Sequence, residues 1–421
     1  MPFSLGDPVK LPCGVVFPNR LAKAAMAELM AGWGKNTPTA ALLEAYNQWA
    51  QGGWGAILTG NVQVDVDHLG TPFDVAMPPE YTDKEKNIAL VDEWRKYADA
   101  CQKHGAPGVV QLCHPGRQSP RPAGRRGIFA QSIAPSAIRL KLGDGYLDQL
   151  AGILSFPAPR EMLQADIDTV IRKFVDAARL MADSGFSGIE LHGAHGYLLD
   201  EFLNAKTNLR TDAYGGTPEK RAKLVLDILA EIRKVVPSNF CVGIKLNSAD
   251  HNSATFEDTM TQVGLLAEAG IDFLEVSGGS YEDPSMMGYG DQQPVKSERT
   301  VAREAFFLEF AAEARKRNPN LVLMLTGGFR SRAGAESAIK AGACDLVGIG
   351  RPSAVNASFP HLLLDESVSE EEAQLPLSKV PPPFIARFLP AKSVGAGLES
   401  AFYADQIKRM GAGLSTFVPA V

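Results

Sequence analysis

The chain has 421 residues, of which 45% are apolar and 21% are charged, a composition typical of globular proteins. The formal net charge is -6, and basic residues cluster only at Arg121, Arg125 and Arg126, so no nucleic-acid partner is expected. The five cysteines are far apart and form no C-x-x-C pair, which argues against structural zinc or an iron–sulfur cluster and for a reducing compartment. No segment is long and apolar enough to predict a membrane span, and residues 1–16 do not resemble a signal peptide, so a cytoplasmic protein is expected.

Eight short apolar segments along the chain have the composition of strands that are buried on both faces. In chain order they are Leu21–Met26, Gly55–Asn61, Gly108–His114, Gly188–His192, Cys241–Asn247, Phe273–Ser277, Leu321–Thr326 and Leu346–Gly350.

Amphipathic stretches with apolar residues at helical spacing lie between these segments. The clearest are Asp166–Ser184, Thr217–Val235, Thr255–Ala269, Ala302–Asn318 and Ala333–Ala341, with caps expected at Thr217, Thr255 and Ser331. Alternation of strands and helices predicts an α/β fold with parallel strands. Eight units favour a (β/α)8 TIM barrel over an open doubly wound sheet, which would normally show a G-x-G-x-x-G turn.

Two segments interrupt the alternation. Residues 115–160 are rich in Pro, Gly and Arg, and are expected to cap the barrel mouth after the third strand. Residues 361–421 are expected to form a C-terminal extension packed on or beside a barrel of residues 1–360. Polar residues at the expected strand ends place the active site at the carboxyl end of the barrel.

The segment from Gly188 to Tyr197 is the most informative in the chain. It is a buried strand that leads into a loop carrying His192, His195 and Tyr197. Two neutral donors beside a weak acid suit a reaction in which a carbonyl oxygen gains negative charge while a nearby carbon is protonated. A single histidine at a strand end is most often structural, but three such groups within six residues favour a catalytic site.

Glycines follow the last two expected strands, in Thr326-Gly327-Gly328-Phe329-Arg330 and Gly348-Ile349-Gly350-Arg351. Either segment alone is explained by a tight turn. Together, on the strands where barrels commonly bind phosphate, they favour a phosphate-bearing cofactor with Arg351 as the cation.

These motifs, together with Pro18-Asn19-Arg20, Gly60-Asn61, residues 111–118 (QLCHPGRQ) and Asn208-Leu209-Arg210, resemble those of the old yellow enzyme family of FMN-dependent ene-reductases. The resemblance extends from about Leu5 to Pro352. It implies that His192 and His195 bind the electron-withdrawing group of the substrate and that Tyr197 donates a proton. It also implies a set of cofactor-binding residues, namely Met26, Ala27, Gly60, Gln111, Lys245, Gly328, Phe329, Gly350 and Arg351.

Three residues depart from the family pattern. Ala27 stands where relatives carry Thr or Cys beside the flavin O4, and Cys113 stands where some carry Trp. Lys245 replaces an arginine that faces the flavin N1 and O2 edge, so it offers a point charge without a planar fork. These departures bear on redox potential and substrate range.

The resemblance implies non-covalent FMN, NADH or NADPH as hydride donor, and a small activated alkene reduced in a ping-pong cycle. Rival interpretations are an FMN-dependent isomerase or dehydrogenase of the same barrel and, more remotely, a non-catalytic flavin-binding protein. The sequence leaves open the physiological alkene, the choice between NADH and NADPH, and whether the protein is a homo-oligomer.

Overall fold

The computed structural model describes residues 4–419, except residues 80, 82, 128, 144, 250–254, 278–308, 378–379 and 381–396. Outside the described residues lie Gly278-Gly279, which follow the sixth expected strand, the first part of the expected helix Ala302–Asn318, and Pro381-Pro382-Pro383 of the expected C-terminal extension.

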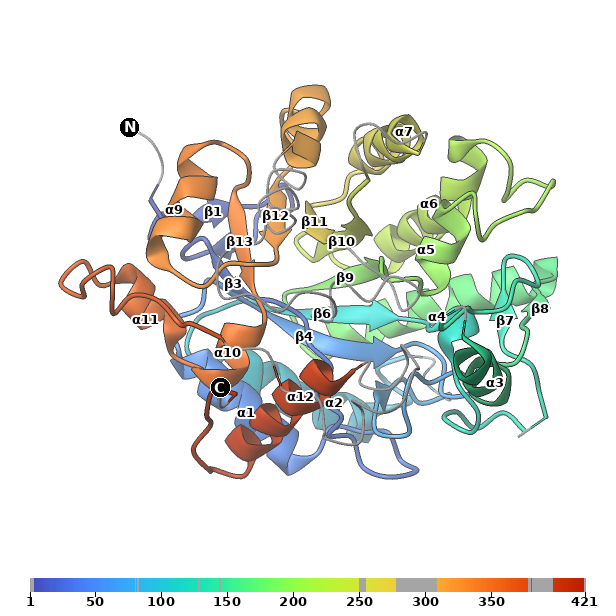
Figure 1. The fold of residues 1–421 in the computed structure, drawn as a ribbon, viewed down its shortest axis with the longest axis horizontal. Helices are drawn as coiled ribbons and strands as arrows, with labels where there is room; N and C mark the ends of the chain where they lie inside the picture. Colours follow the sequence, from blue (N-terminus) through green and yellow to red (C-terminus); the bar gives the residue numbers. More distant parts are fainter. Residues whose placement is uncertain are drawn as a thin grey trace.

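The fold is a closed barrel of eight parallel strands, which confirms the expected (β/α)8 architecture (Figure 1). The strands are β3 (Leu21–Lys23), β4 (Ala56–Gln63), β6 (Gly108–Cys113), β9 (Gly188–Gly193), β10 (Cys241–Asn247), β11 (Phe273–Ser277), β12 (Leu323–Thr326) and β13 (Leu346–Ile349). Pairing of β13 with β3, and of β3 with β4, closes the barrel. A short strand, β5 (Val75–Ala76), pairs with the end of β4.

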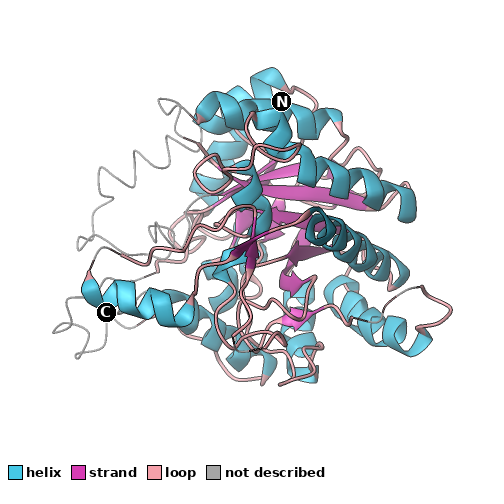
Figure 2. Cartoon of the chain, turned by 90° about the vertical axis from the view of Figure 1, so that its right-hand side faces the viewer, coloured by secondary structure: helices cyan, strands magenta, loops and turns pink. Residues whose placement is uncertain are grey.

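Helices surround the strands (Figure 2). They include α1 (Ala40–Gln51), α2 (Ile88–Gln102), α4 (Gln164–Asp183), α5 (Leu198–Leu203), α6 (Pro218–Val235), α7 (Phe256–Glu268), α9 (Arg332–Lys340), α10 (Arg351–Val355) and α11 (Phe359–Leu364). Residues 309–317 are also helical. Thr217 and Ser331 cap α6 and α9 with their side chains, as expected. Thr255 occupies the N-cap position of α7, as expected, but its side chain makes no capping hydrogen bond.

A hairpin closes the amino end of the barrel. Strands β1 (Val9–Lys10) and β2 (Val16–Phe17) pair antiparallel. Their buried Val9, Leu11 and Phe17 pack with inward residues of the barrel strands, among them Leu58, Phe273 and Met324. Because apolar side chains fill this end, the polar strand ends at the opposite mouth are left for chemistry.

The insertion after β6 contains η1 (Gly116–Gln118), β7 (Ile133–Ala134), α3 (Tyr146–Ser155) and β8 (Arg160–Glu161), with β7 and β8 paired. Near the C-terminus, α12 (Leu398–Gly411) packs on α1 and α10. The amide of Gln48 donates to the carbonyl of Met410 at 2.9 Å. We keep the division into a barrel (1–360), a cap (115–160) and an extension (361–421) as a proposal, and residue 360 itself lies within α11. No helix among the described residues is long and apolar enough to cross a membrane.

Candidate active site

Polar side chains from neighbouring strands meet near the carboxyl end of the barrel. In the parallel register, Lys245 of β10 stands between His192 of β9 and Glu275 of β11. Gln111 of β6 stands beside Glu190 of β9. All five side chains are buried. The strand pairing therefore gathers a histidine, an amide, a lysine and two carboxyl groups in one region of the barrel.

The structure brings His192, His195 and Tyr197 together, as the sequence predicts. The ring centroids of His192 and His195 are 5.0 Å apart, with the ring planes at 78°. Those of His192 and Tyr197 are 4.7 Å apart, with the planes at 88°. Edge-to-face packing of this kind fixes ring orientation, because the positive edge of one ring meets the negative face of the next.

Hydrogen bonds and burial define the protonation of the two histidines. The backbone N–H of Ala194 donates to Nδ1 of His192 at 3.3 Å, so the proton of a neutral His192 ring is on Nε2. Burial lowers the pKa of His192 well below its ordinary value, and burial with the nearby Lys245 lowers that of His195 to about 3. Both rings are therefore neutral near pH 7. Nε2 of His195 lies 3.0 Å from Oγ of Ser277, for which the sequence suggested no role.

A tight turn sets the position of His195. His195 and Gly196 both have left-handed φ angles, 62° and 74°. The Gly196 N–H donates to Oδ2 of Asp200 at 2.7 Å, and the amide of Asn247 donates to the same oxygen at 2.9 Å. The amide of Gln118 donates to the His195 carbonyl at 2.8 Å. Sequence reasoning missed Asp200, although an acidic residue in the first turn of α5 is a recognisable partner for free loop amides.

A lysine and two carboxyl groups form a buried ionic cluster. Nζ of Lys245 lies 2.8 Å from Oε1 of Glu275, and Nε2 of Gln111 donates to Oε2 of Glu190 at 2.5 Å. Burial, followed by the charge of Glu275, raises the pKa of Glu190 well above its ordinary value. Burial opposes ionisation of Lys245 and Glu275 too, but their mutual attraction outweighs it, raising the pKa of Lys245 and lowering that of Glu275. The sequence indicated Lys245 but gave Glu190 and Glu275 no role.

The ends of β3, β4 and β13 lie close together. A Cβ added to Gly60 would lie 2.2 Å from the Met26 carbonyl oxygen, so only glycine fits there. A Cβ on Gly350 would first meet Sδ of Met26, at 3.8 Å. Ala27 is exposed beside them. Oε1 of Glu28, a residue without a role in the sequence interpretation, accepts the Gly60 N–H at 2.9 Å.

The glycines that follow β12 are exposed and leave room beside them. Gly327 and Gly328 have φ angles of 134° and 80°, a region that side chains rarely adopt. A Cβ on Gly327 would meet nothing within 4 Å. Phe329 is partly buried against the main core.

Arg351 has a partner that the sequence did not suggest. Its Nη1 donates to Oε2 of Glu399 in α12 at 2.7 Å. The C-terminal helix thus places a carboxylate on the arginine expected to bind phosphate.

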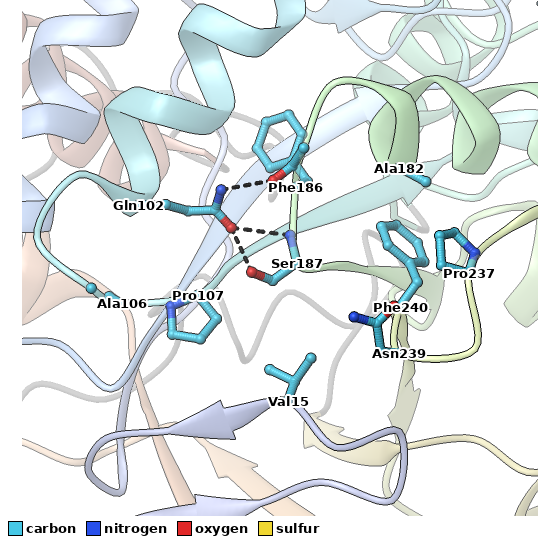
Figure 3. Close-up of a pocket in the computed structure, with 12 residues that line it drawn as sticks. Val15, Gln102, Ala106, Pro107, Ala182, Phe186, Ser187, Pro237, Asn239 and Phe240 are labelled. Atoms are coloured by element: carbon cyan, nitrogen blue, oxygen red, sulfur yellow. Dashed lines mark hydrogen bonds between the residues drawn. The ribbon is translucent and has the colours of Figure 1, made fainter. Parts of the chain in front are cut away.

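A surface pocket near the amino ends of several strands does not belong to this site, and Figure 3 shows the residues that line it. It has a volume of about 390 Å³ and is lined by residues that precede the strands, including Pro107, Ser187 and Phe240. Oε1 of Gln102 accepts hydrogen bonds from the backbone and hydroxyl of Ser187, at 3.0 and 2.6 Å. The pocket lies at the amino ends of the strands, away from the mouth where barrel enzymes carry their chemistry.

Comparison with known proteins identifies the family. Residues 4–367 match the model of the NADH:flavin oxidoreductase / NADH oxidase family. The chain belongs to this family.

Similar curated proteins include NADH-dependent flavin oxidoreductases of three fungi. The Neonectria sp. protein is 44% identical over 96% of this chain, which spans 54% of that protein's length. The Hypocrea jecorina protein is 43% identical over 90% of this chain and 94% of its own length. The Talaromyces variabilis protein is 40% identical over 96% of this chain and 98% of its own length.

Solved structures support the fold. The old yellow enzyme homologue from Zymomonas mobilis has a TM-score of 0.69 at 23% identity, covering 89% of this chain and 97% of its own. Morphinone reductase has a TM-score of 0.67 at 22% identity, covering 87% of this chain and 92% of its own.

The family implies FMN as cofactor and NADH or NADPH as hydride donor, and the barrel mouth fits a flavin nucleotide. Gly327 and Gly328 are exposed, and a Cβ on Gly327 would meet nothing within 4 Å, so the backbone there leaves space of the kind that a phosphate group needs.

Proposed function

We propose that this protein reduces activated C=C bonds, such as those of enones, enals, maleimides and nitroalkenes, with NADH or NADPH as donor in a ping-pong cycle. The observation that carries the proposal is the pair of neutral imidazoles with Tyr197 packed against one of them. The sequence contains no Rossmann fingerprint, which fits a single binding place used by the nicotinamide and the alkene in turn.

In this proposal His192 and His195 bind the oxygen of the activating carbonyl or nitro group. Nε2 of His192 carries a proton because Nδ1 accepts from Ala194. A neutral N–H donor stabilises oxygen as it gains negative charge, and it has no proton that is easily lost. Tyr197 donates the proton that the substrate carbon needs. Bound FMN supplies the two-electron transfer.

The cofactor contacts are also proposals. Met26, Ala27, Gly60 and Gln111 line the flavin ring, and Lys245 faces its N1 and O2 edge. Gly328, Phe329, Gly350 and Arg351 hold the phosphate. The gathering of Met26, Gly60 and Gly350 at one point of the barrel mouth supports the first group.

The test is a two-step anaerobic experiment. The purified protein is reduced with NADH, or with NADPH in parallel, and is then mixed with cyclohexenone while the flavin absorbance is followed. We expect reoxidation at a rate that depends on the enone, with saturated ketone as the product. An FMN-dependent isomerase would rearrange the enone without reoxidation, and a non-catalytic flavin protein would do neither. Colourless protein that cannot be reconstituted with FMN would contradict the proposal.

A further inference from the structure

Glu275 is the buried partner of the lysine proposed to face the flavin. Its Oε1 lies 2.8 Å from Nζ of Lys245, and both side chains are almost wholly removed from solvent. The two residues are paired in the register of β10 and β11, so the contact is built into the barrel wall. A lysine side chain has four rotatable bonds, so holding it in one conformation costs conformational entropy. The ion pair with Glu275 therefore fixes where the ammonium lies.

Glu190 lies near this pair but does not add a second negative charge. Its pKa is raised by burial and by the charge of Glu275. Two carboxyl groups held close together in a buried site do not both ionise, and the one with the lysine as partner keeps the charge. The cluster thus holds one ammonium, one carboxylate and one neutral acid, and its net charge is zero.

The surrounding titratable groups do not upset this balance. Cys113 of β6 is buried, which raises the pKa of its thiol and keeps it neutral. His192 and His195 are neutral. The ammonium of Lys23 in β3 is within electrostatic reach of Lys245 and of the Glu28 carboxyl group, outside the cluster. Within the cluster, the charge is therefore decided by Lys245 and Glu275.

We propose that Glu275 is a positioning residue that fixes Lys245 and offsets its charge, so that the bound flavin has a lower reduction potential than a lone lysine would give. The proposal rests on the placement of Lys245 in the proposed function. A cation favours the negatively charged reduced flavin, and a carboxylate 2.8 Å from that cation weakens the effect.

The test is a redox titration of the FMN-loaded protein against a reference dye. Glu275→Gln removes the charge and keeps the shape, and we expect the equilibrium to move at least tenfold toward reduced flavin. For a two-electron couple this is a rise of about 30 mV. The matched control is Glu190→Gln, which replaces a neutral acid by a neutral amide and should shift the equilibrium by much less. The double variant Glu190→Gln/Glu275→Gln holds position 190 uncharged and should show the same shift as Glu275→Gln.

An unchanged potential in Glu275→Gln, or equal shifts in Glu275→Gln and Glu190→Gln, would overturn the proposal. Removal of one member of a buried ion pair can prevent folding. In that case Glu275→Asp keeps both charges but shortens the side chain, which draws the carboxylate away from Nζ of Lys245, so the equilibrium should again move toward reduced flavin. A wild-type potential in Glu275→Asp would count against a role for Glu275. Reoxidation of the flavin by cyclohexenone is measured separately. If the wild-type protein is reoxidised but Glu275→Gln has an unchanged potential, this inference alone fails. If the wild-type protein is not reoxidised, the proposed function fails.

Discussion

Replacement of His192 tests the proposed site most directly. His192→Ala removes the Nε2–H donor, whose tautomer is set by the bond from Ala194 to Nδ1. A donor to a developing oxyanion contributes about 2 to 4 kcal/mol, which corresponds to a loss of about 30-fold to 1000-fold in the rate of enone reduction. Binding of a phenol-type ligand, whose oxygen we expect to accept from the same donor, should weaken in parallel.

The assay separates the two half-reactions. Reduction of the flavin by NADH should change little in His192→Ala, because that step develops no oxyanion. Reoxidation by an enone in a single turnover should be slow, and His195→Ala should behave in the same way. If both single variants reduce enones at the wild-type rate, the two histidines are structural and do not donate to the substrate oxygen.

Three further predictions address the proton donor, the loop and a helix cap. Tyr197→Phe keeps the aromatic ring packed on His192 but removes the phenolic proton. Reduction of weakly activated enones should therefore fall steeply, while flavin reduction by NADH stays normal. Enone reduction at the wild-type rate in a single turnover would show that the proton comes from another source. Burial raises the pKa of Asp200 to about 6, above its value in the unfolded chain. The contribution of Asp200 to the unfolding free energy is therefore full below about pH 4, and up to about 3 kcal/mol of it is lost as the pH rises through about 6. Denaturant unfolding across this pH range should show the loss in the wild type and a flatter profile in Asp200→Asn. Thr39 accepts the Leu42 N–H at 3.2 Å and donates to the Met30 carbonyl at 2.8 Å, so Thr39→Ala should cost about 1 kcal/mol in thermal unfolding and Thr39→Ser should cost less.

The sequence predicted the barrel well because strand and helix patterns are local. Strand bounds were less accurate. β3 ends at Lys23, although Ala24 still donates to the Ile349 carbonyl at 3.0 Å. β4 continues to Gln63, beyond the expected Asn61, with a register irregularity between Leu58 and Asn61. Apolar composition does not record where a strand bends away from its neighbour, since that depends on both strands.

The candidate site also contains residues that the sequence predicted and residues that it did not. His192, His195 and Tyr197 were predicted together because they lie in one loop and their chemistry is legible from their spacing. Glu275 and Ser277 contact this region only through the register of β10 with β11. A glutamate inside a buried strand predicts that a partner lies nearby, because an isolated charge there is too costly. The sequence alone does not say which residue the partner is.

Arg351 shows how a residue singled out in the sequence can have an unforeseen environment. The sequence interpretation gave the C-terminal extension no chemistry, yet α12 brings Glu399 onto the guanidinium. A guanidinium has five N–H donors in a planar fork, and the hydrogen bond from Nη1 engages one edge of it. Among the described residues the bond to Glu399 is the one hydrogen bond that the Arg351 side chain makes, and in the proposed function the other donors serve the phosphate while Glu399 holds the plane in place. In the proposed function the negative charge of Glu399 also reduces the attraction of Arg351 for phosphate, which would couple the docking of α12 to the affinity for the cofactor.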